Sequence, residues 1–444
     1  MPEKEQNSHK DFMIETIKQR PINRKKLLRR TILTAAMAVM FGLVACVTFL
    51  VLEPVISNWL QPEEGPNIVV FPEDQQEMLP EEMLAENQGS GGNTLNGGLG
   101  LSDMDEEKLR EVLSKMIFDE NSCRQLYSAM SDYVEELNQY TVTVTAVSSR
   151  VDWFNNVQEN KNQSSGMILT DNGKELLILT YATPLRSAKS YSLTFNNKVT
   201  VNATVKQVDN YTNLAVMAVD FKELPDDMQR GNIKYPSLNF YSGKSMPGTP
   251  VVAVGSPMGI RNSIGYGVIT AADAQHSVSD RNLRIIQTDI VGSKNAGGVL
   301  FNLEGQVVGI ITGNRVGYDV ENVIYAYSIQ DLKKTLERLS NGKSIPYLGI
   351  MGINVTNEIS IEFGVPMGGF VTKVDMDSPA MRAGIQQGDV IVGIGDKDIS
   401  SFNEYTNVLM QLEPGRNIEI RIKRQAQDGY KDMTFDMETG ETKK

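Results

Sequence analysis

The chain has 444 residues, of which 41% are hydrophobic and 7% aromatic, so it is long enough to form two or three domains with buried cores. Acidic residues (55) outnumber basic residues (43) and give a formal charge of −12, which opposes binding to nucleic acid. The only cysteines are Cys46 and Cys123, so the sequence contains no disulfide framework and no CxxC metal site, and we expect neither a metal nor a cofactor.

The first element is an uncharged, mostly apolar segment, residues 31–52. At about 1.5 Å per residue it is long enough to cross roughly 30 Å of hydrocarbon, so it predicts a transmembrane helix. Basic residues cluster in 20–30, whereas no lysine or arginine occurs in 53–107. By the positive-inside rule, residues 1–30 form a cytoplasmic tail. We therefore expect a single-pass protein of the cell membrane whose globular domains are extracytoplasmic.

One alternative stays open for this segment. The sequence Leu43-Val44-Ala45-Cys46 resembles a lipoprotein processing box, and cleavage there would place a lipid on Cys46. Apolar residues continue as far as Leu52, at positions where a processed lipoprotein becomes small and polar. A retained membrane anchor is therefore the better interpretation.

Two segments connect this anchor to the rest of the chain. Residues 53–100 are rich in Glu, Pro, Gly, Asn and Gln, a composition that predicts a flexible acidic linker. Within 101–139 apolar residues recur at helical spacing in two sets, so we expect two short amphipathic helices. These helices can pack against the next domain, or they can serve as an oligomerisation element, because their apolar faces must be covered.

The remainder of the chain divides into a β-rich part and a smaller mixed part. Residues 140–340 contain short β-branched runs separated by turn residues, and they end in a helical pattern that Asn341-Gly342 terminates. This spacing predicts an all-β barrel or sandwich. Residues 344–438 alternate strands with short helical patterns, which predicts one small α+β module.

Several motifs of the β domain are similar to those of one family. Ile286-Gln287-Thr288-Asp289 precedes Asn295-Ala296-Gly297-Gly298-Val299-Leu300-Phe301-Asn302, which resembles the nucleophile region of HtrA/Deg serine proteases, IQTD followed by N-S-G-G-P-L-x-N. Residues 178–183 (ILTYAT) resemble the family's I-L-T-N-N-H, and residues 209–216 (DNYTNLAV) resemble its D-x-x-x-D-L-A-V. The resemblance implies a mostly β fold, with a trypsin-like double β-barrel over 140–340.

All three catalytic positions of that family are replaced in this chain. The resemblance places Thr183 at the histidine position, Asn213 at the aspartate position and Ala296 at the serine position. Ala296 has no oxygen for an acyl-enzyme, Thr183 cannot accept a proton near neutral pH, and Asn213 lacks a stabilising charge. Loss of the serine or of the histidine alone lowers kcat by on the order of a millionfold in a subtilisin-type triad. We therefore expect no intact catalytic site.

Other residues could in principle supply catalytic groups. The chain has two histidines: His9 precedes the anchor, and His276 lies in a polar run that predicts an exposed loop. The oxyanion-equivalent positions are Lys294 and Ala296, in a loop one residue shorter than the family's, which would redirect its N–H groups. A relocated site would use Ser293 as nucleophile and Lys294 as base, but neighbours on an extended loop tend to point apart.

The C-terminal module, residues 344–438, resembles a PDZ domain of the bacterial HtrA type. Its markers are Tyr347-Leu348-Gly349-Ile350, Ser378-Pro379-Ala380 and the segment 383–391 (AGIQQGDVI). The resemblance implies that backbone N–H groups of the Tyr347–Ile350 loop bind a peptide's C-terminal carboxylate, while the following strand takes the peptide as an added β-strand. We therefore assign peptide binding to four residues: Tyr347, Leu348, Gly349 and Ile350.

Together these features predict a membrane-anchored HtrA-like pseudoprotease. It would bind unfolded or C-terminal peptides of envelope proteins and act in protein quality control or protease regulation. Two alternatives remain: an active serine endopeptidase with a relocated site that degrades misfolded envelope proteins, and a structural partner in hetero-oligomers with an active HtrA-like protease. Self-association is a further expectation, and the PDZ ligand and the oligomeric state are not indicated by the sequence.

Overall fold

A computed structural model describes residues 33, 35–41, 66–71, 120–151, 157–186, 188–238, 247–313 and 322–442. The chain forms two units, Met1–Gly65 and Pro66–Lys444. In the first unit, residues 33 and 35–41 are helical, and the rest of the predicted transmembrane segment lies outside the described residues. Among the helices that the structure describes, none combines the length and the apolar character that a membrane crossing requires.

A short stretch of the predicted acidic linker, residues 66–71, packs on the core of the second unit. Val69 and Phe71 are buried, and their N–H groups donate to Asn341 Oδ1 at 2.8 Å and to Glu337 Oε1 at 2.9 Å. Alternate apolar side chains of an extended segment point to one side, and here that side is the core. This stretch therefore differs from the flexible linker that its surrounding composition predicted.

Helix α4 (Glu120–Asn138) forms where the second amphipathic helix was expected, and the first lies outside the described residues. Its C-terminal half faces the domain that follows: Val134 and Leu137 are buried, and Tyr133 donates from its hydroxyl to the Asn302 carbonyl. Leu126, nearer the start of the helix, is 51% exposed. The helix thus packs on the β domain at one end and leaves apolar surface at the other.

The β domain begins with a seven-stranded antiparallel sheet in the order β5-β4-β1-β2-β3-β7-β6. The strands alternate or are uniformly apolar, and their inward side chains form one buried cluster around Val144, Ile178 and Met217. The strands are β1 (Thr141–Val151), β2 (Val157–Asp171), β3 (Glu175–Tyr181), β4 (Ser190–Phe195), β5 (Thr200–Asn202), β6 (Thr204–Asp209) and β7 (Leu214–Asp220); short 3₁₀ turns η2 (Thr183–Leu185), η3 (Phe221–Glu223) and η4 (Asp226–Met228) connect or follow them.

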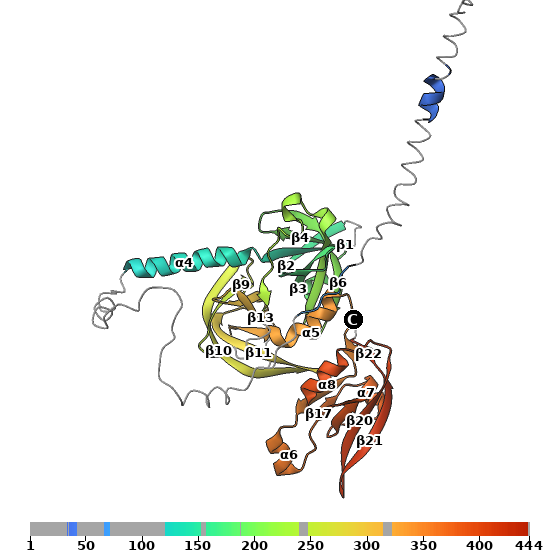
Figure 1. Cartoon of the computed structure of the whole chain (residues 1–444). Helices are drawn as coiled ribbons and strands as arrows, with labels where there is room; N and C mark the ends of the chain where they lie inside the picture. Colours follow the sequence, from blue (N-terminus) through green and yellow to red (C-terminus); the bar gives the residue numbers. More distant parts are fainter. Residues whose placement is uncertain are drawn as a thin grey trace, which may run out of the picture. The chain divides into compact units, whose positions relative to one another are not determined.

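A second seven-stranded sheet follows in the order β12-β9-β10-β11-β14-β13-β8. Figure 1 shows its long yellow strands β10 and β11. An additional pairing of β12 with β13 joins strands near its two ends, so this sheet closes into a barrel. The strands are β8 (Ser237–Leu238), β9 (Pro250–Ser256), β10 (Ser263–Val278), β11 (Arg281–Val291), β12 (Gly297–Asn302), β13 (Gln306–Thr312) and β14 (Val323–Ser328), and helix α5 (Ile329–Ser340) follows directly.

The C-terminal module has its own core of buried aliphatic and aromatic side chains, including Leu348, Phe402 and Tyr405. Its main sheet has the order β16-β17-β18-β20-β21 with β19 beside β18, and β15 pairs with β22. The elements are β15 (Pro346–Tyr347), β16 (Ile350–Asn354), α6 (Asn357–Phe363), β17 (Gly369–Val374), α7 (Pro379–Ala383), β18 (Val390–Ile394), β19 (Lys397–Asp398), α8 (Phe402–Leu409), β20 (Asn417–Ala426), β21 (Gly429–Glu438) and β22 (Gly440–Glu441). The predicted fold class, a mostly β domain followed by an α+β module, is confirmed for these parts of the chain.

Candidate functional site

The structure brings Thr183 and Asn213 into direct contact. Thr183 opens η2, immediately after β3, and Asn213 precedes β7, the strand that pairs with β3. The Thr183 hydroxyl donates to Asn213 Oδ1 at 2.6 Å, and the Thr183 N–H donates to the same oxygen at 2.9 Å. Asn213 has φ 58°, a left-handed conformation that asparagine tolerates well. The two groups form a neutral hydrogen bond where an imidazole and a carboxylate would form a charged one.

Ala296 closes a tight turn just before β12. Its side chain is buried, and its N–H donates to the Ser293 carbonyl at 3.0 Å. Ala296 N–H is one of the two donors assigned to the oxyanion-equivalent position, and it is used inside the loop rather than offered to a substrate. The other assigned residue, Lys294, is exposed. This loop therefore lacks the nucleophile and directs at least one oxyanion donor away from a ligand.

Tyr181 is a site residue that the sequence analysis did not single out. Its hydroxyl accepts from the Gly298 N–H at 2.7 Å and donates to the Ile311 carbonyl at 2.6 Å. Burial of this hydroxyl raises the pKa of Tyr181, so it remains protonated and keeps its role as a donor. The ring lies so close to Gly297 that a Cβ there would be 2.9 Å from Tyr181 Cε2. The segment before Thr183 is thus joined to the segment after Ala296.

The signal for Tyr181 was present in the sequence, because a tyrosine stands where the resembling motif has an asparagine. Its effect depends on the partner strands β12 and β13, which are more than a hundred residues away in the chain. A bulky ring at this position bonds to both strands through one hydroxyl. Tyr181 therefore stabilises the region that follows Ala296.

The residues proposed for a relocated site do not form a catalytic pair. Ser293 Oγ accepts from the Asn295 N–H at 3.2 Å, so it stabilises its own turn. Lys294 is exposed, whereas a neutral lysine base requires burial. No hydrogen bond between Ser293 and Lys294 occurs among the interactions of the described residues. The geometry thus gives no support to this alternative.

His276 lies in a strand, and the prediction of an exposed loop for it was wrong. It belongs to β10, is half-buried, and has its Nδ1 3.0 Å from the Tyr327 hydroxyl, with the two rings stacked. Burial lowers the pKa of His276, which favours the neutral imidazole. The polar run that suggested a loop is the alternating, partly exposed face of a long hairpin strand.

The predicted peptide-binding loop is intact, and its N–H groups already have a partner. Leu348 and Gly349 donate to Asp280 Oδ2 at 2.8 and 2.9 Å, and Ile350 donates to Asp280 Oδ1 at 3.0 Å. Tyr347, the first residue of the loop, is buried and donates to Asp375 Oδ2 at 3.0 Å. Asp280 is at the tip of the β10–β11 hairpin and was not predicted as a site residue.

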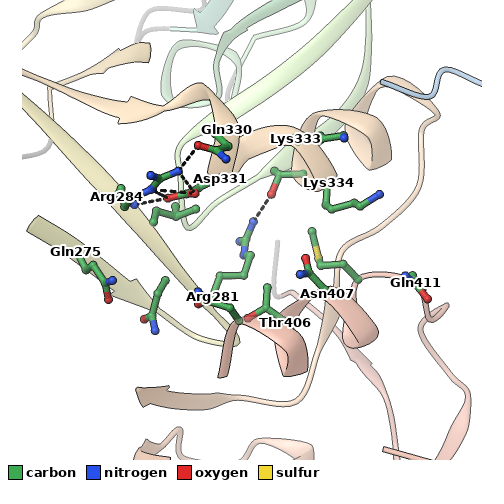
Figure 2. Close-up of a pocket in the computed structure, with 15 residues that line it drawn as sticks. Gln275, Arg281, Arg284, Gln330, Asp331, Lys333, Lys334, Thr406, Asn407 and Gln411 are labelled. Atoms are coloured by element: carbon green, nitrogen blue, oxygen red, sulfur yellow. Dashed lines mark hydrogen bonds and ion pairs between the residues drawn. The ribbon is translucent and has the colours of Figure 1, made fainter. Parts of the chain in front are cut away.

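A polar cleft of about 670 Å³ lies beside this contact, between β11, α5 and α8. Figure 2 shows the side chain of Arg284 directed at Asp331 and Gln330 on one side of the cleft. Arg281 lies between that side and Thr406. Arg284 forms an ion pair with Asp331 at 3.0 Å. Among the described residues no cluster of three or more His, Cys, Asp or Glu side chains could hold a metal ion.

The first sheet carries Thr183 and Asn213, and the second, closed into a barrel, carries Ala296 at the start of β12. An α+β module follows, so the arrangement is a trypsin-like fold with a C-terminal PDZ domain. Sequence comparison agrees: residues 164–310 match the family described as "Trypsin-like peptidase domain", and residues 346–438 match "PDZ domain". The order of these two domains, together with relatives described as HtrA and DegP-like proteases, supports the assignment to the HtrA/Deg family.

Two relatives illustrate the similarity. The chain is 28% identical over 276 residues to "Probable periplasmic serine endoprotease DegP-like" of Halomonas elongata, covering 60% of this chain and 55% of the relative. It is 25% identical over 342 residues to "Serine protease Do-like HtrA" of Bacillus subtilis, covering 71% and 74%. The chain therefore spans about half the length of the Halomonas relative. A solved structure, "HtrA-type protease AlgW with decapeptide", is 19% identical with a TM-score of 0.49 and covers 71% of this chain and 99% of that one.

Proposed function

We propose that this chain is an HtrA-like pseudoprotease, which binds peptides or protein C-termini through its PDZ domain and does not cleave them. The observation that carries the proposal is the pair Thr183–Asn213, bonded at 2.6 Å in place of a histidine and an aspartate. The methyl side chain of Ala296 and the internal hydrogen bond of its N–H add to this, because they remove the nucleophile and redirect an oxyanion donor. Function in envelope protein quality control or protease regulation is part of the same proposal.

Binding without cleavage can be tested in one experiment. The immobilised full chain is incubated with a pool of mixed-sequence decapeptides that carry free C-terminal carboxylates, and with the same pool amidated. We expect retention of the free-carboxylate peptides only, because loop N–H groups bind an anion, and mass spectrometry should find them uncut. A fluorophosphonate probe should label neither the wild type nor Ala296→Ser, which gains a hydroxyl but has no base to activate it. Cut peptides or labelled protein would overturn the pseudoprotease proposal, and equal retention of both pools would overturn C-terminal recognition.

We also propose that residues 31–52 anchor the chain in the cell membrane, with both folded domains outside the cytoplasm. Support comes from the uncharged length of this segment and from the basic residues that precede it. The Halomonas relative is described as periplasmic, which agrees with an extracytoplasmic location. Association with an active HtrA-like protease, or with further copies of this chain, stays a prediction.

Cell fractionation tests the anchor. The full chain should remain in the membrane pellet after an alkaline carbonate wash, because an apolar helix is not released by disrupting ionic contacts. Deleting residues 31–52 should move the protein to the soluble fraction. Release of the full chain by the wash would contradict the proposal, and a labelled lipid on Cys46 would favour a lipoprotein anchor instead.

A further inference from the structure

The tip of the β10–β11 hairpin is polar and yet buried. Val278 pairs with Arg281 to close the hairpin, so Ser279 and Asp280 form a two-residue turn. Ser279, Asp280 and Arg281 are each only 3% exposed. Hairpin turns normally face solvent, because their backbone groups need water as a partner. This turn instead enters the PDZ domain, where the Thr406 hydroxyl on α8 donates to the Asp280 carbonyl at 2.8 Å.

The Asp280 side chain occupies the anion-binding loop of the PDZ domain. Both carboxylate oxygens accept hydrogen bonds from the N–H groups of residues 348–350, at 2.8 to 3.0 Å. The Tyr405 hydroxyl, on α8, adds a fourth bond to Asp280 Oδ1 at 2.6 Å. These N–H groups are the donors that the proposed function assigns to a peptide's C-terminal carboxylate. The loop cannot serve both carboxylates at once.

The hairpin tip also covers the strand edge that an added peptide would use. The Asp280 N–H donates to the Ile350 carbonyl at 2.6 Å, as the last residue of an added strand would. Two residues further along β16, the Gly352 carbonyl accepts from Asn282 Nδ2 at 2.9 Å. Asp280 therefore supplies both a carboxylate to the loop and an N–H to the strand, which is the pattern of a bound C-terminal residue.

We propose that Asp280 is an internal substitute for the ligand's C-terminal carboxylate, so that the PDZ domain is self-occupied and a peptide binds only by displacing the tip of the β10–β11 hairpin. This inference rests on the proposed peptide-binding function and adds its regulation. The base of the tip is held separately by the β domain, because Arg281 donates to Asp209 on β6 and to Thr335 on α5. The β domain therefore presents Asp280 to the PDZ domain from a fixed position.

Three features make the docked state displaceable. Burial raises the pKa of Asp280, although the bonds from Tyr405 and the loop oppose this, so burying its charge carries a cost. Asn282 Oδ1 is buried without a hydrogen-bond partner, which carries a further cost that release to water removes. The polar cleft of about 670 Å³ shown in Figure 2 is lined by Arg281 and Asn282, so open space lies beside one side of the buried tip.

The test compares the full chain with Asp280→Asn and with the control Asp273→Asn, an exposed aspartate of the same hairpin. Asp280→Asn leaves the side chain about the same size but removes its negative charge. It also places an NH₂ group, itself a donor, against the N–H groups of the loop. We expect its apparent affinity for a fluorescein-labelled pool of free-carboxylate decapeptides to rise at least about tenfold. This factor corresponds to a wild type in which about one tenth of the molecules have an open binding loop. Amide hydrogen exchange of residues 348–350 should accelerate by a similar factor. Asp273→Asn should match the wild type in both measurements.

Each outcome separates the two proposals. Equal peptide affinity and equal exchange in the wild type and Asp280→Asn would overturn the self-occupied site and leave peptide binding standing. Faster exchange in Asp280→Asn without binding of any peptide by either protein would confirm that Asp280 occupies the loop and overturn the proposed binding function. If Asp280→Asn does not fold, Thr406→Val removes a bond to the docked tip from the PDZ side and should change exchange and affinity in the same direction. Unprotected 348–350 amides in the wild type would alone refute the inference.

Discussion

Replacing Arg281 with methionine is expected to lower the free energy of unfolding by about 3–5 kcal/mol, because it leaves a buried carboxylate without its counter-charge. Asp209 is fully buried, and Arg281 contacts both of its oxygens, at 2.9 and 3.1 Å. Arg281 also donates to Thr335 at 2.8 Å on α5. The pair thus connects β6, β11 and α5. Urea unfolding of the full chain measures the loss.

The matched control is Arg421→Met, which breaks an ion pair with Asp398 whose carboxylate side chain is 89% exposed. Solvent screens that pair, so its loss should cost less than about 1 kcal/mol. In the double variant Arg281→Met, Asp209→Leu most of the lost stability should return, because no unpaired charge remains buried. If the Arg281 and Arg421 variants lose equal stability, the ion pair is not the source of the effect.

Much of the candidate site could be predicted from the sequence because the motifs are local and occur in a fixed order. Thr183 and Asn213 are 30 residues apart, yet Thr183 lies two residues after the end of β3 and Asn213 directly precedes β7. Strand β3 pairs antiparallel with β7, with Tyr181 opposite Leu214. The end of β3 therefore lies beside the start of β7. The residue types at the three positions that the resemblance assigns to the triad are the basis on which the sequence predicts that the usual chemistry is absent.

Backbone direction and long-range docking could not be predicted in this way. The N–H of Ala296 points to Ser293 because of the φ and ψ angles of a short loop, which the residue types there do not specify. Asp280 lies in a polar hairpin turn that is locally typical of a solvent-exposed one. Its partners begin 68 residues later, in another domain, so only the packing of the two domains reveals its role.

His276 illustrates the same limit within one domain. Polar residues around it suggested a loop, but β10 continues through them because its partner β11 supplies backbone hydrogen bonds over the whole hairpin. Pairing energy from a neighbouring strand outweighed a local composition that favours turns.

Gly298→Ala is expected to lower the free energy of unfolding by more than about 4 kcal/mol, or to prevent folding. Gly298 has φ 125°, and a Cβ there would lie 2.2 Å from the Val254 carbonyl oxygen, in the strand that pairs with it. Its N–H also holds the Tyr181 hydroxyl, so any shift of β12 breaks that bond too. Gly248→Ala is the control, because Gly248 has φ 91° and open space around its Cβ position. That variant should lose only about 1 kcal/mol, from backbone strain alone. Equal melting temperatures for the two variants would show that close packing of β9 on β12 does not require Gly298.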